Sequence, residues 1–229
     1  MAAKDVTEGV APGHRRVKRS SGFVEEVFEI IRADLMSLRI APDTRISIDS
    51  LARELGVSQT PIREALSMLE AIGLVTRRRF AGYCSAPQLN SKQLDELYEV
   101  RLLIEPYAAA RAAERMSDAQ LQQIGDLVRG MEPGESRTSY DRFAVQDSEL
   151  HDLIAWASGN PLIQDSLARL HAHLHIFRLR FHSEVTTEAC TEHAALIDAL
   201  TRRNPRDAEI AMRLHIEKSY NRMVAFAQT

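Results

Sequence analysis

The sequence predicts a mainly α-helical protein with an N-terminal winged helix-turn-helix and a C-terminal all-α antiparallel helical bundle. Residues 51–74 form two short helical patterns that are separated by a break at Gly56. Two short strand patterns follow at 74–85, whereas residues 87–229 contain only capped helical patterns. We therefore expect a flexible basic arm at 1–20, a DNA-binding domain at 21–86 and a helical effector-binding and dimerisation domain at 87–229.

The composition is that of an ordinary globular protein without a membrane span. A chain of 229 residues with 45% hydrophobic and 27% charged residues can bury one or two ordinary cores. The net charge of −3 is uneven: residues 1–86 hold 13 Lys and Arg against 11 Asp and Glu (+2), and the remaining residues hold 16 against 21 (−5). No apolar run can span a membrane, and the basic N-terminus is no secretory signal. Cys84 and Cys190 lie far apart, so we expect a cytoplasmic protein with reduced thiols.

The two helical patterns at 51–74 are the most informative stretch. Apolar residues keep the helical period on both sides of Gly56, which can adopt the left-handed conformation that ends a helix. Ser58 is expected to cap the second helix. The start of this helix then carries the polar side chains of Gln59, Thr60 and Arg63, together with the free backbone N–H groups of its first turn. We expect this end of the helix to be exposed. An ordinary core helix pair explains the apolar residues but leaves this donor-rich start unexplained.

The flanking segments complete the predicted winged domain. A helical pattern at 21–38 precedes a turn, and residues 45–47 are expected to form a short strand before Ser47 caps the next helix. Two strands at 74–85 should turn near Ala81 and Gly82. Arginines near this wing tip can enter a minor groove or bind phosphates, although an exposed charge run is the alternative. These arginines are Arg77, Arg78 and Arg79, with Arg45 in the neighbouring strand.

Pro87 and Asn90 mark the expected boundary of the helical domain. Its second helix should open with a capping box formed by Ser117 and Gln120. Proline and glycine at 133–134 indicate a loop, and Asn-Pro pairs start two later helices. The predicted helices span about 91–116, 139–157, 161–181, 187–202 and 205–227, and a further helix begins at about 118. An antiparallel bundle is the economical arrangement of such helices.

Four residues of the helical domain form a candidate metal site. Asp147 and His151 lie four residues apart, so they project from one face of a helix. His193 and His215 lie in apolar helical surroundings that would turn them inward. Three imidazoles and a carboxylate suit zinc or nickel better than a hard ion. Scattered histidines are more often core or surface residues, and this alternative is favoured for four others, His171, His173, His175 and His182.

The segment from Ile48 to Leu66, with the sequence IDSLARELGVSQTPIREAL, closely resembles the GntR family of bacterial transcription regulators. Leu69-Glu70, Gly73-Leu74-Val75 and the wing Gly82 extend the resemblance. The later helices are similar to the FCD effector domain of the FadR-like subfamily, so the likeness covers nearly the whole chain from Phe23. It implies a homodimer, located in the bacterial cytoplasm, that reads a short palindromic operator. A small molecule would release it from DNA or, in some cases, recruit it.

The resemblance also implies roles for individual residues. Thr60 and Arg63 match DNA-contact positions of the family, and Gly82 matches the wing glycine. Gln59 departs from the family, which often has arginine there. Because glutamine pairs with adenine and arginine with guanine, we predict a changed base preference at the position facing Gln59.

The FCD resemblance strengthens the metal prediction and adds an effector. Metal-binding FCD domains have an Asp-x-x-x-His pair and two later histidines, which Asp147, His151, His193 and His215 match. Zinc is favoured, with nickel and manganese as alternatives. Arg101 resembles a position that pairs with the carboxylate of an effector. Arg222 lies two turns beyond His215 and can point into the same pocket, but either arginine can instead form a salt bridge, Arg101 with Glu105.

The resulting hypothesis is a repressor, not an enzyme, whose affinity for double-stranded DNA is controlled by a small organic acid at a metal-containing pocket. Two alternatives remain at this stage. The metal itself can be the signal, without an organic effector. A metal-dependent hydrolase is also conceivable, since three ligands plus water can activate a nucleophile. The sequence pattern places no further carboxylate with the four ligands to act as a general base, and a hydrolase leaves the winged domain unexplained.

Overall fold

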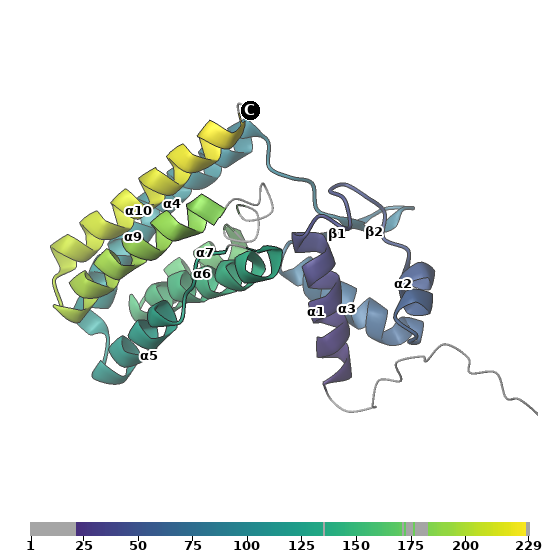
Figure 1. Cartoon of the computed structure of the whole chain (residues 1–229), viewed down its shortest axis with the longest axis horizontal. Helices are drawn as coiled ribbons and strands as arrows, with labels where there is room; N and C mark the ends of the chain where they lie inside the picture. The colour runs from purple at the N-terminus through teal and green to yellow at the C-terminus, as the bar shows by residue number, and fades with distance from the viewer. Residues whose placement is uncertain (1–21, 135, 171, 173–175, 177–182, 228–229) are drawn as a thin grey trace, which may run out of the picture.

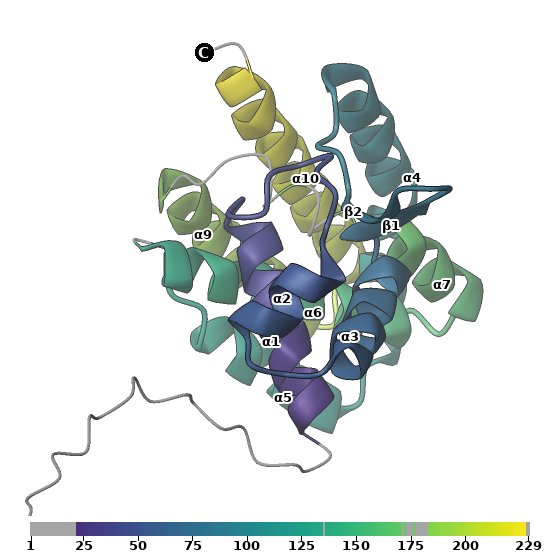
Figure 2. The same ribbon diagram turned by 90° about the vertical axis from the view of Figure 1, so that its right-hand side faces the viewer.

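The computed structural model describes residues 22–134, 136–170, 172, 176 and 183–227. Two parts are visible in Figure 1: a small part formed by α1, α2, α3 and the hairpin β1–β2, and a larger bundle formed by the later helices. Figure 2, turned by 90°, shows α1, α2 and α3 in front of the bundle, with the hairpin projecting from the edge of the smaller part. The predicted fold class is confirmed.

The smaller part is a winged helix-turn-helix. Its helices are α1 (Phe23–Met36), α2 (Ile48–Glu54) and α3 (Gln59–Ala71), followed by β1 (Val75–Arg78) and β2 (Gly82–Ser85). α1 packs against α3, with fully buried Ile31, Leu35 and Ile62 between them. Gly56 has a φ of +67°, the left-handed backbone expected at the break between α2 and α3.

The wing is an antiparallel hairpin in which Val75 lies opposite Ser85 and Arg78 opposite Gly82. The strand expected at 45–47 is wrong in its extent. Only an isolated bridge between Arg45 and Cys84 forms, flanked by a hydrogen bond from the Ile46 amide to the Tyr83 carbonyl. This segment therefore adds a single bridged residue to the edge of β2, because its chain turns into α2 at once.

The two helix caps of the motif differ from each other. Ser47 caps α2 as predicted, since its hydroxyl accepts a hydrogen bond from the Ser50 amide. Ser58 occupies the N-cap position of α3 with extended backbone, but its side chain makes no capping hydrogen bond. Ser58 therefore occupies the predicted capping position without forming a capping hydrogen bond.

The bundle begins at α4, whose N-terminus has a capping box formed by Asn90 and Gln93. The predicted box of Ser117 and Gln120 opens the next helix. α10 packs mainly against α4 and α9, and these long helices lie side by side in Figure 1. The described helices are α4 (Ser91–Arg115), α5 (Asp118–Arg129), α6 (Arg137–Ala157), α7 (Pro161–Leu170), α9 (Ser183–Thr201) and α10 (Pro205–Ala227).

Some sequence predictions fall outside the described residues. These are the basic arm at 1–20, the end of the helix predicted at 161–181, and the four histidines for which a role other than metal binding was favoured: His171, His173, His175 and His182. Residues 172 and 176 of that segment are described, and both are helical and buried.

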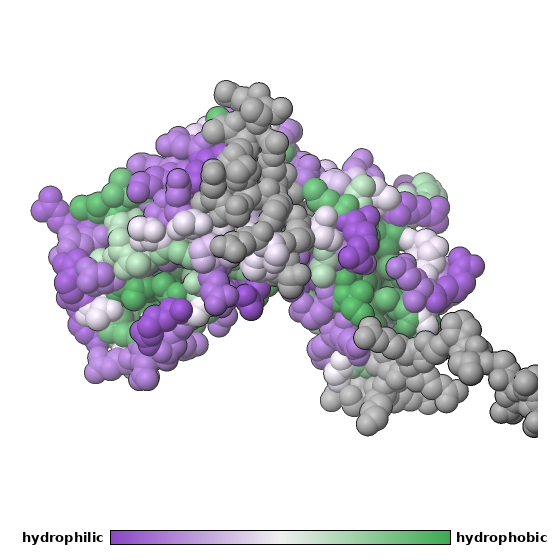
Figure 3. All heavy atoms as spheres, viewed as in Figure 1, coloured by the Kyte–Doolittle hydropathy of each residue, from purple (hydrophilic) through white to green (hydrophobic). Residues whose placement is uncertain are grey.

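Each part contributes to the buried core. Leu66 and Leu69 are fully buried in the winged part, and Tyr140, Phe143 and Leu200 are fully buried in the bundle. On the face seen in Figure 3, both parts show green hydrophobic patches among mostly hydrophilic residues. Within the described ranges, no helix is long and apolar enough to cross a membrane.

Candidate functional site

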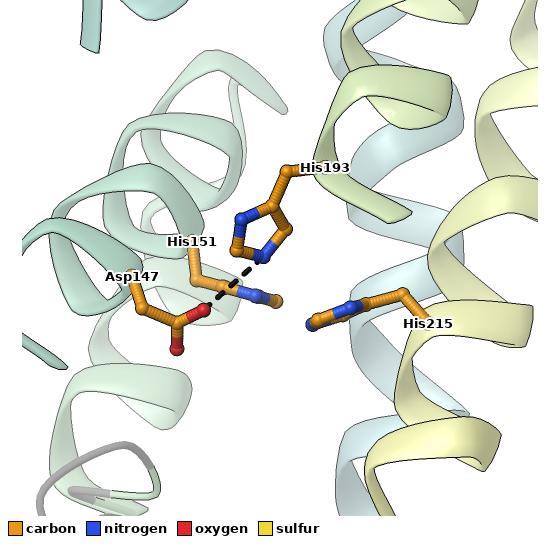
Figure 4. Close-up of side chains that lie close together, drawn as sticks. All are labelled: Asp147, His151, His193 and His215. Atoms are coloured by element: carbon orange, nitrogen blue, oxygen red, sulfur yellow. Dashed lines mark ion pairs between the residues drawn. The ribbon is translucent and has the colours of Figure 1, made fainter. Parts of the chain in front are cut away.

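Four buried side chains from three helices converge inside the bundle. Asp147 and His151 come from adjacent turns of α6, His193 from α9 and His215 from α10 (Figure 4). One potential ligand atom from each residue lies within 4.8 Å of the others. The structure thus brings together all four residues that were predicted as metal ligands.

The contacts within this cluster are close but incompletely hydrogen-bonded. His193 Nε2 lies 3.1 Å from Asp147 Oδ1, while the ring centroids of His193 and His215 are 4.8 Å apart. Phe143 stacks against His193 with an interplanar angle of 10° and so orients that ring. Both ring nitrogens of His193 are buried, and neither forms a hydrogen bond with a described residue. An ion between the four side chains would compensate for this buried polarity.

A second layer of charged residues supports His151. Its Nδ1 atom lies 2.5 Å from Glu105 Oε2, and the other oxygen of Glu105 accepts a 2.6 Å hydrogen bond from Arg101 Nε. Arg101 also lies over the Tyr98 ring, with its Cζ 5.3 Å from the ring centroid. Because Glu105 is an acceptor, this arrangement turns the opposite nitrogen of His151 toward the cluster.

A matching arrangement supports His215. Its Nδ1 atom lies 2.9 Å from Glu192 Oε2, and Arg222 donates hydrogen bonds of 2.6 and 3.0 Å to the two oxygens of Glu192. Arg222 also binds Glu188 at 3.0 Å. Two histidines of the cluster therefore each have a glutamate behind them, and each glutamate has an arginine of its own. Such outer carboxylates set the tautomer and orientation of metal-binding histidines.

Electrostatics favours the protonation states that bind a cation. Burial raises the pKa of Glu105, but the charges of Arg101 and His151 lower it well below its usual range. Burial also opposes ionisation of Glu192, yet hydrogen bonds from His215 and Arg222 lower its pKa to about 2. Burial lowers the pKa of His215 to about 4, although its hydrogen bond to Glu192 opposes that shift. At neutral pH, His215 is therefore a neutral imidazole beside the ionised carboxylate of Glu192.

The donor set fits a divalent ion. His151 and His215 each turn Nδ1 toward a glutamate, which leaves Nε2 as the potential metal donor, and Asp147 supplies a carboxylate oxygen. Three nitrogens and one oxygen suit a borderline ion such as zinc. All four side chains are buried.

The predicted effector residues lie in the outer layer of this site. Arg101 has a side-chain exposure of 1%, whereas the side chain of Arg222 is 11% exposed. Arg222 lines a groove of about 450 Å³ between α9 and α10, together with Glu188, Thr191, Glu192, Lys218 and Asn221. Both arginines are paired with glutamates in this state, so an organic acid would have to compete for their guanidinium groups.

The predicted base-reading residues lie at the exposed start of α3. Ser58, Gln59, Thr60 and Arg63 are all exposed. The Gln59 amide donates a 2.5 Å hydrogen bond to Asp49 Oδ1, and its oxygen accepts a 3.3 Å hydrogen bond from Arg63. Asp49 therefore fixes the side chain of Gln59 from the neighbouring helix α2.

The predicted arginines of the wing gather around its tip. Arg45, Arg77, Arg78, Arg79 and Gly82 line one shallow hollow, together with Phe80 and Ala81. Arg78 forms an ion pair with Asp43. Gly82 has a φ of +78°, and the position next to its Cα is open, so conformation rather than space favours glycine there.

Comparison with protein families accounts for both parts of the chain. Residues 23–83 match the model described as bacterial regulatory proteins, gntR family, and residues 96–218 match the FCD domain. The chain belongs to the GntR family and carries an FCD domain. It is therefore a transcriptional regulator, and family membership supplies no enzymatic activity. Regulators of this family bind DNA operators through the helix-turn-helix and typically act as dimers.

Several curated regulators are similar to this GntR-family protein over most of their length. The HTH-type transcriptional repressor RspR of Escherichia coli (strain K12) is 25% identical over 198 residues, which cover 85% of this chain and 86% of that protein. The HTH-type transcriptional regulator LutR of Bacillus subtilis (strain 168) is 29% identical over 191 residues, covering 74% and 86%. The gluconate operon transcriptional repressor of the same organism is 28% identical over 147 residues, covering 64% and 59%.

Solved structures share the fold of this GntR-family protein. McbR/YncC of E. coli superimposes with a TM-score of 0.68 at 19% identity, covering 88% of this chain and 97% of that chain. A GntR protein of Streptococcus agalactiae gives a TM-score of 0.50 at 25% identity, covering 87% and 99%. The first likeness supports the fold alone.

Sequence reasoning missed three residues that support the predicted sites. It treated Glu105 only as a possible partner of Arg101 and gave Glu192 no role, whereas each glutamate contacts a histidine of the cluster. The i to i+4 spacing of Arg101 and Glu105 signalled their pairing. Asp49 gave no signal, because its contact with Gln59 crosses from one helix to another.

Proposed function

We propose that this GntR-family protein is a homodimeric repressor whose affinity for a palindromic operator is controlled by a small organic acid. The acid would bind at a divalent metal ion held by Asp147, His151, His193 and His215. The observation that carries this proposal is the convergence of these four side chains, with Glu105 and Glu192 behind two of the histidines. Zinc is the preferred occupant, with nickel and manganese as alternatives.

The metal would act as a Lewis acid that accepts a carboxylate oxygen of the effector. Residues of the chain would provide the remaining recognition. Arg222 borders the groove beside the cluster, so it is the arginine that an incoming acid reaches from solvent. Arg101 is fully buried, and it would bind only an acid that penetrates to the cluster. Bidentate pairing with a carboxylate would replace the bonds that either arginine now makes to glutamate.

DNA recognition would divide between α3 and the wing. Gln59, Thr60 and Arg63 would face base edges in the major groove, with Ser58 at the phosphate backbone. Of the wing residues, Gly82 would support the turn, while four arginines would bind phosphates or enter the minor groove. These are Arg45, Arg77, Arg78 and Arg79, all of which are exposed.

A homodimer would match the two halves of a palindrome. Exposed apolar side chains on two packed helices support a self-association surface: Leu103 and Tyr107 on α4, and Ile210 and Leu214 on α10. Large exposed apolar residues of this kind become favourable when a partner covers them.

Helix α6 provides a physical connection between effector and DNA. Asp147 and His151 lie in the metal cluster, while Val145 and Trp156 of the same helix line a groove of about 510 Å³ that also contains Phe28 of α1. A shift of α6 on effector binding would therefore change the groove that it shares with α1, and α1 in turn packs on α3. Coupling requires that the acid bind the DNA-competent and DNA-incompetent dimers with different affinities.

A thermal-shift screen of small hydroxy acids and dicarboxylates tests this function. Full-length protein is assayed after zinc loading and after dialysis against a chelator. We expect at least one acid to raise the melting temperature of the zinc-loaded protein only, since ligands stabilise the state that they bind. The same acid should then release the protein from an operator selected from random duplexes, whereas its amide should not. No response to any acid, with or without zinc, would contradict an organic effector.

The ion pairs of Arg101 and Arg222 favour one second candidate, a regulator for which the metal itself is the signal. Both guanidinium groups already have carboxylate partners within the protein. This alternative predicts that zinc titrated into the protein–operator complex changes DNA affinity without any organic acid. The effector model predicts that zinc alone leaves that affinity unchanged.

A further inference from the structure

Phe80 occupies the tip of the wing and is 92% exposed. β1 ends at Arg78 and β2 begins at Gly82, so Phe80 belongs to the turn between the strands. One exposed apolar residue needs no special explanation. Its exposure in the turn of the hairpin nevertheless leaves the phenyl ring accessible to a partner.

The backbone of Phe80 supplies an independent observation. Its φ of +65° lies in the left-handed region, which is sterically unfavourable for a bulky residue. The turn is closed by a hydrogen bond of 3.3 Å from the Ala81 amide to the Arg78 carbonyl. A glycine or asparagine would adopt this conformation with less strain. Residues with strained backbone conformations are often found at functional sites, including those that contact a ligand.

The charges around Phe80 indicate the chemistry of its partner. Arg45 and Arg77–Arg79 line the same hollow as Phe80. The Cζ atom of Arg79 lies 4.8 Å from the centroid of the Phe80 ring, and that of Arg77 lies 5.6 Å from the Tyr83 ring. The arginine side chains around the apolar Phe80 ring are complementary to a polyanion whose interior is apolar. Duplex DNA is such a polymer, with phosphates along the groove edges and stacked bases within.

We propose that Phe80 is an apolar wedge that enters the minor groove of the operator, partly unstacks one base-pair step and bends the duplex. This inference rests on the proposed operator binding of the wing. The surrounding arginines bind the flanking phosphates, while the phenyl ring makes the contact with the bases. Pyrimidine–purine steps such as TA and CA unstack most readily, so the wedge selects such a step without hydrogen-bonding to it.

The test uses full-length protein and an operator that the wild-type protein selects from random duplexes. Phe80→Ala and Phe80→Leu are compared with Arg79→Ala, which keeps the phenyl ring and removes a neighbouring charge. Bending is measured by energy transfer between dyes at the two ends of the duplex. Unstacking is measured by the fluorescence of 2-aminopurine at each step facing the wing. Because Phe80 is exposed, thermal unfolding should change little in all three variants.

Wild-type protein should bend the operator and brighten 2-aminopurine at one step. Phe80→Ala should abolish both signals and weaken binding about tenfold, whereas Phe80→Leu should retain both in part. Arg79→Ala should keep both signals but bind more weakly, with a salt dependence reduced by about one unit of slope. Equal bending and equal fluorescence in wild type and Phe80→Ala would overturn the wedge. Failure of the wild-type protein to select any duplex would instead overturn operator binding itself.

Discussion

His215 and Glu192 are joined by a 2.9 Å hydrogen bond that crosses from α10 to α9. The bond fixes which ring nitrogen of His215 carries the proton, because an ionised carboxylate only accepts. Glu192 in turn is held by Arg222, so the imidazole, the carboxylate and the guanidinium form one connected unit. Metal affinity and effector recognition would therefore share residues rather than occupy separate regions.

Substitution of Glu192 tests whether this outer layer supports a metal. Glu192→Gln should weaken zinc binding by about 10- to 100-fold, because the neutral amide holds the His215 N–H less firmly. Competition with a chromophoric chelator measures this affinity. Glu188→Gln is the matched control, since Glu188 is largely exposed and contacts Arg222 but not His215. An unchanged zinc affinity in Glu192→Gln would exclude the supporting role.

Removal of a central ligand should have a larger effect. His193→Ala should abolish stoichiometric zinc in the purified protein, as measured by elemental analysis, because it deletes one of the four converging donors. Its operator affinity in the absence of effector should remain near that of wild type. Asp198→Ala, an exposed substitution on the same helix, should keep the metal. Full zinc content in His193→Ala would show that the cluster is not the binding site.

Chelation of the metal should destabilise the wild-type protein. A ligand at 1,000 times its dissociation constant stabilises the folded state by about 4.1 kcal/mol, so removing it should lower the melting temperature measurably. Differential scanning calorimetry with and without chelator provides the measurement. His193→Ala should show no such shift, which separates metal loss from other effects of the chelator.

The side chain at position 59 should set one base of the operator. We expect wild-type protein to prefer adenine at the facing position and Gln59→Arg to prefer guanine, with about 1–3 kcal/mol of discrimination in each case. Selection from random duplexes, followed by sequencing, measures both preferences. Asp49→Ala should weaken the adenine preference without replacing it, because the Gln59 amide loses its fixed partner. Identical selected sequences for wild type and Gln59→Arg would refute this assignment.

Arg222 should contribute to effector affinity. A charged hydrogen bond contributes about 1.5–3 kcal/mol, so Arg222→Ala should weaken binding of the screened acid by roughly tenfold or more. Titration calorimetry at saturating zinc separates this loss from any change in metal occupancy. Arg213→Ala on the same helix is the control, because the ion pair described for Arg213 is with Glu209 of its own helix. Equal acid affinity in wild type and Arg222→Ala would remove Arg222 from the pocket.

The parts of the fold that could be predicted from the sequence are those set by local patterns of residues. The apolar spacing around Gly56, the capping box of Ser117 and Gln120, and the turn near Gly82 are each encoded within a few residues. Predictions failed where the expected feature depended on a specific hydrogen bond to another residue. The strand expected at 45–47 had a single bridging position available on β2, and the Ser58 hydroxyl did not turn toward the α3 amides.

The sequence by itself determined that Asp147 and His151 share one helical face, because four residues separate them on a continuous helix. Apolar neighbours marked His193 and His215 as further candidates, and the resemblance to FCD domains strengthened the assignment of all four. Only the tertiary structure decided that Glu105 and Glu192 stand behind two of the histidines, and that Arg222 is already paired with Glu192. These contacts depend on how separate helices pack, and the spacing of residues within one helix carries no information about that packing.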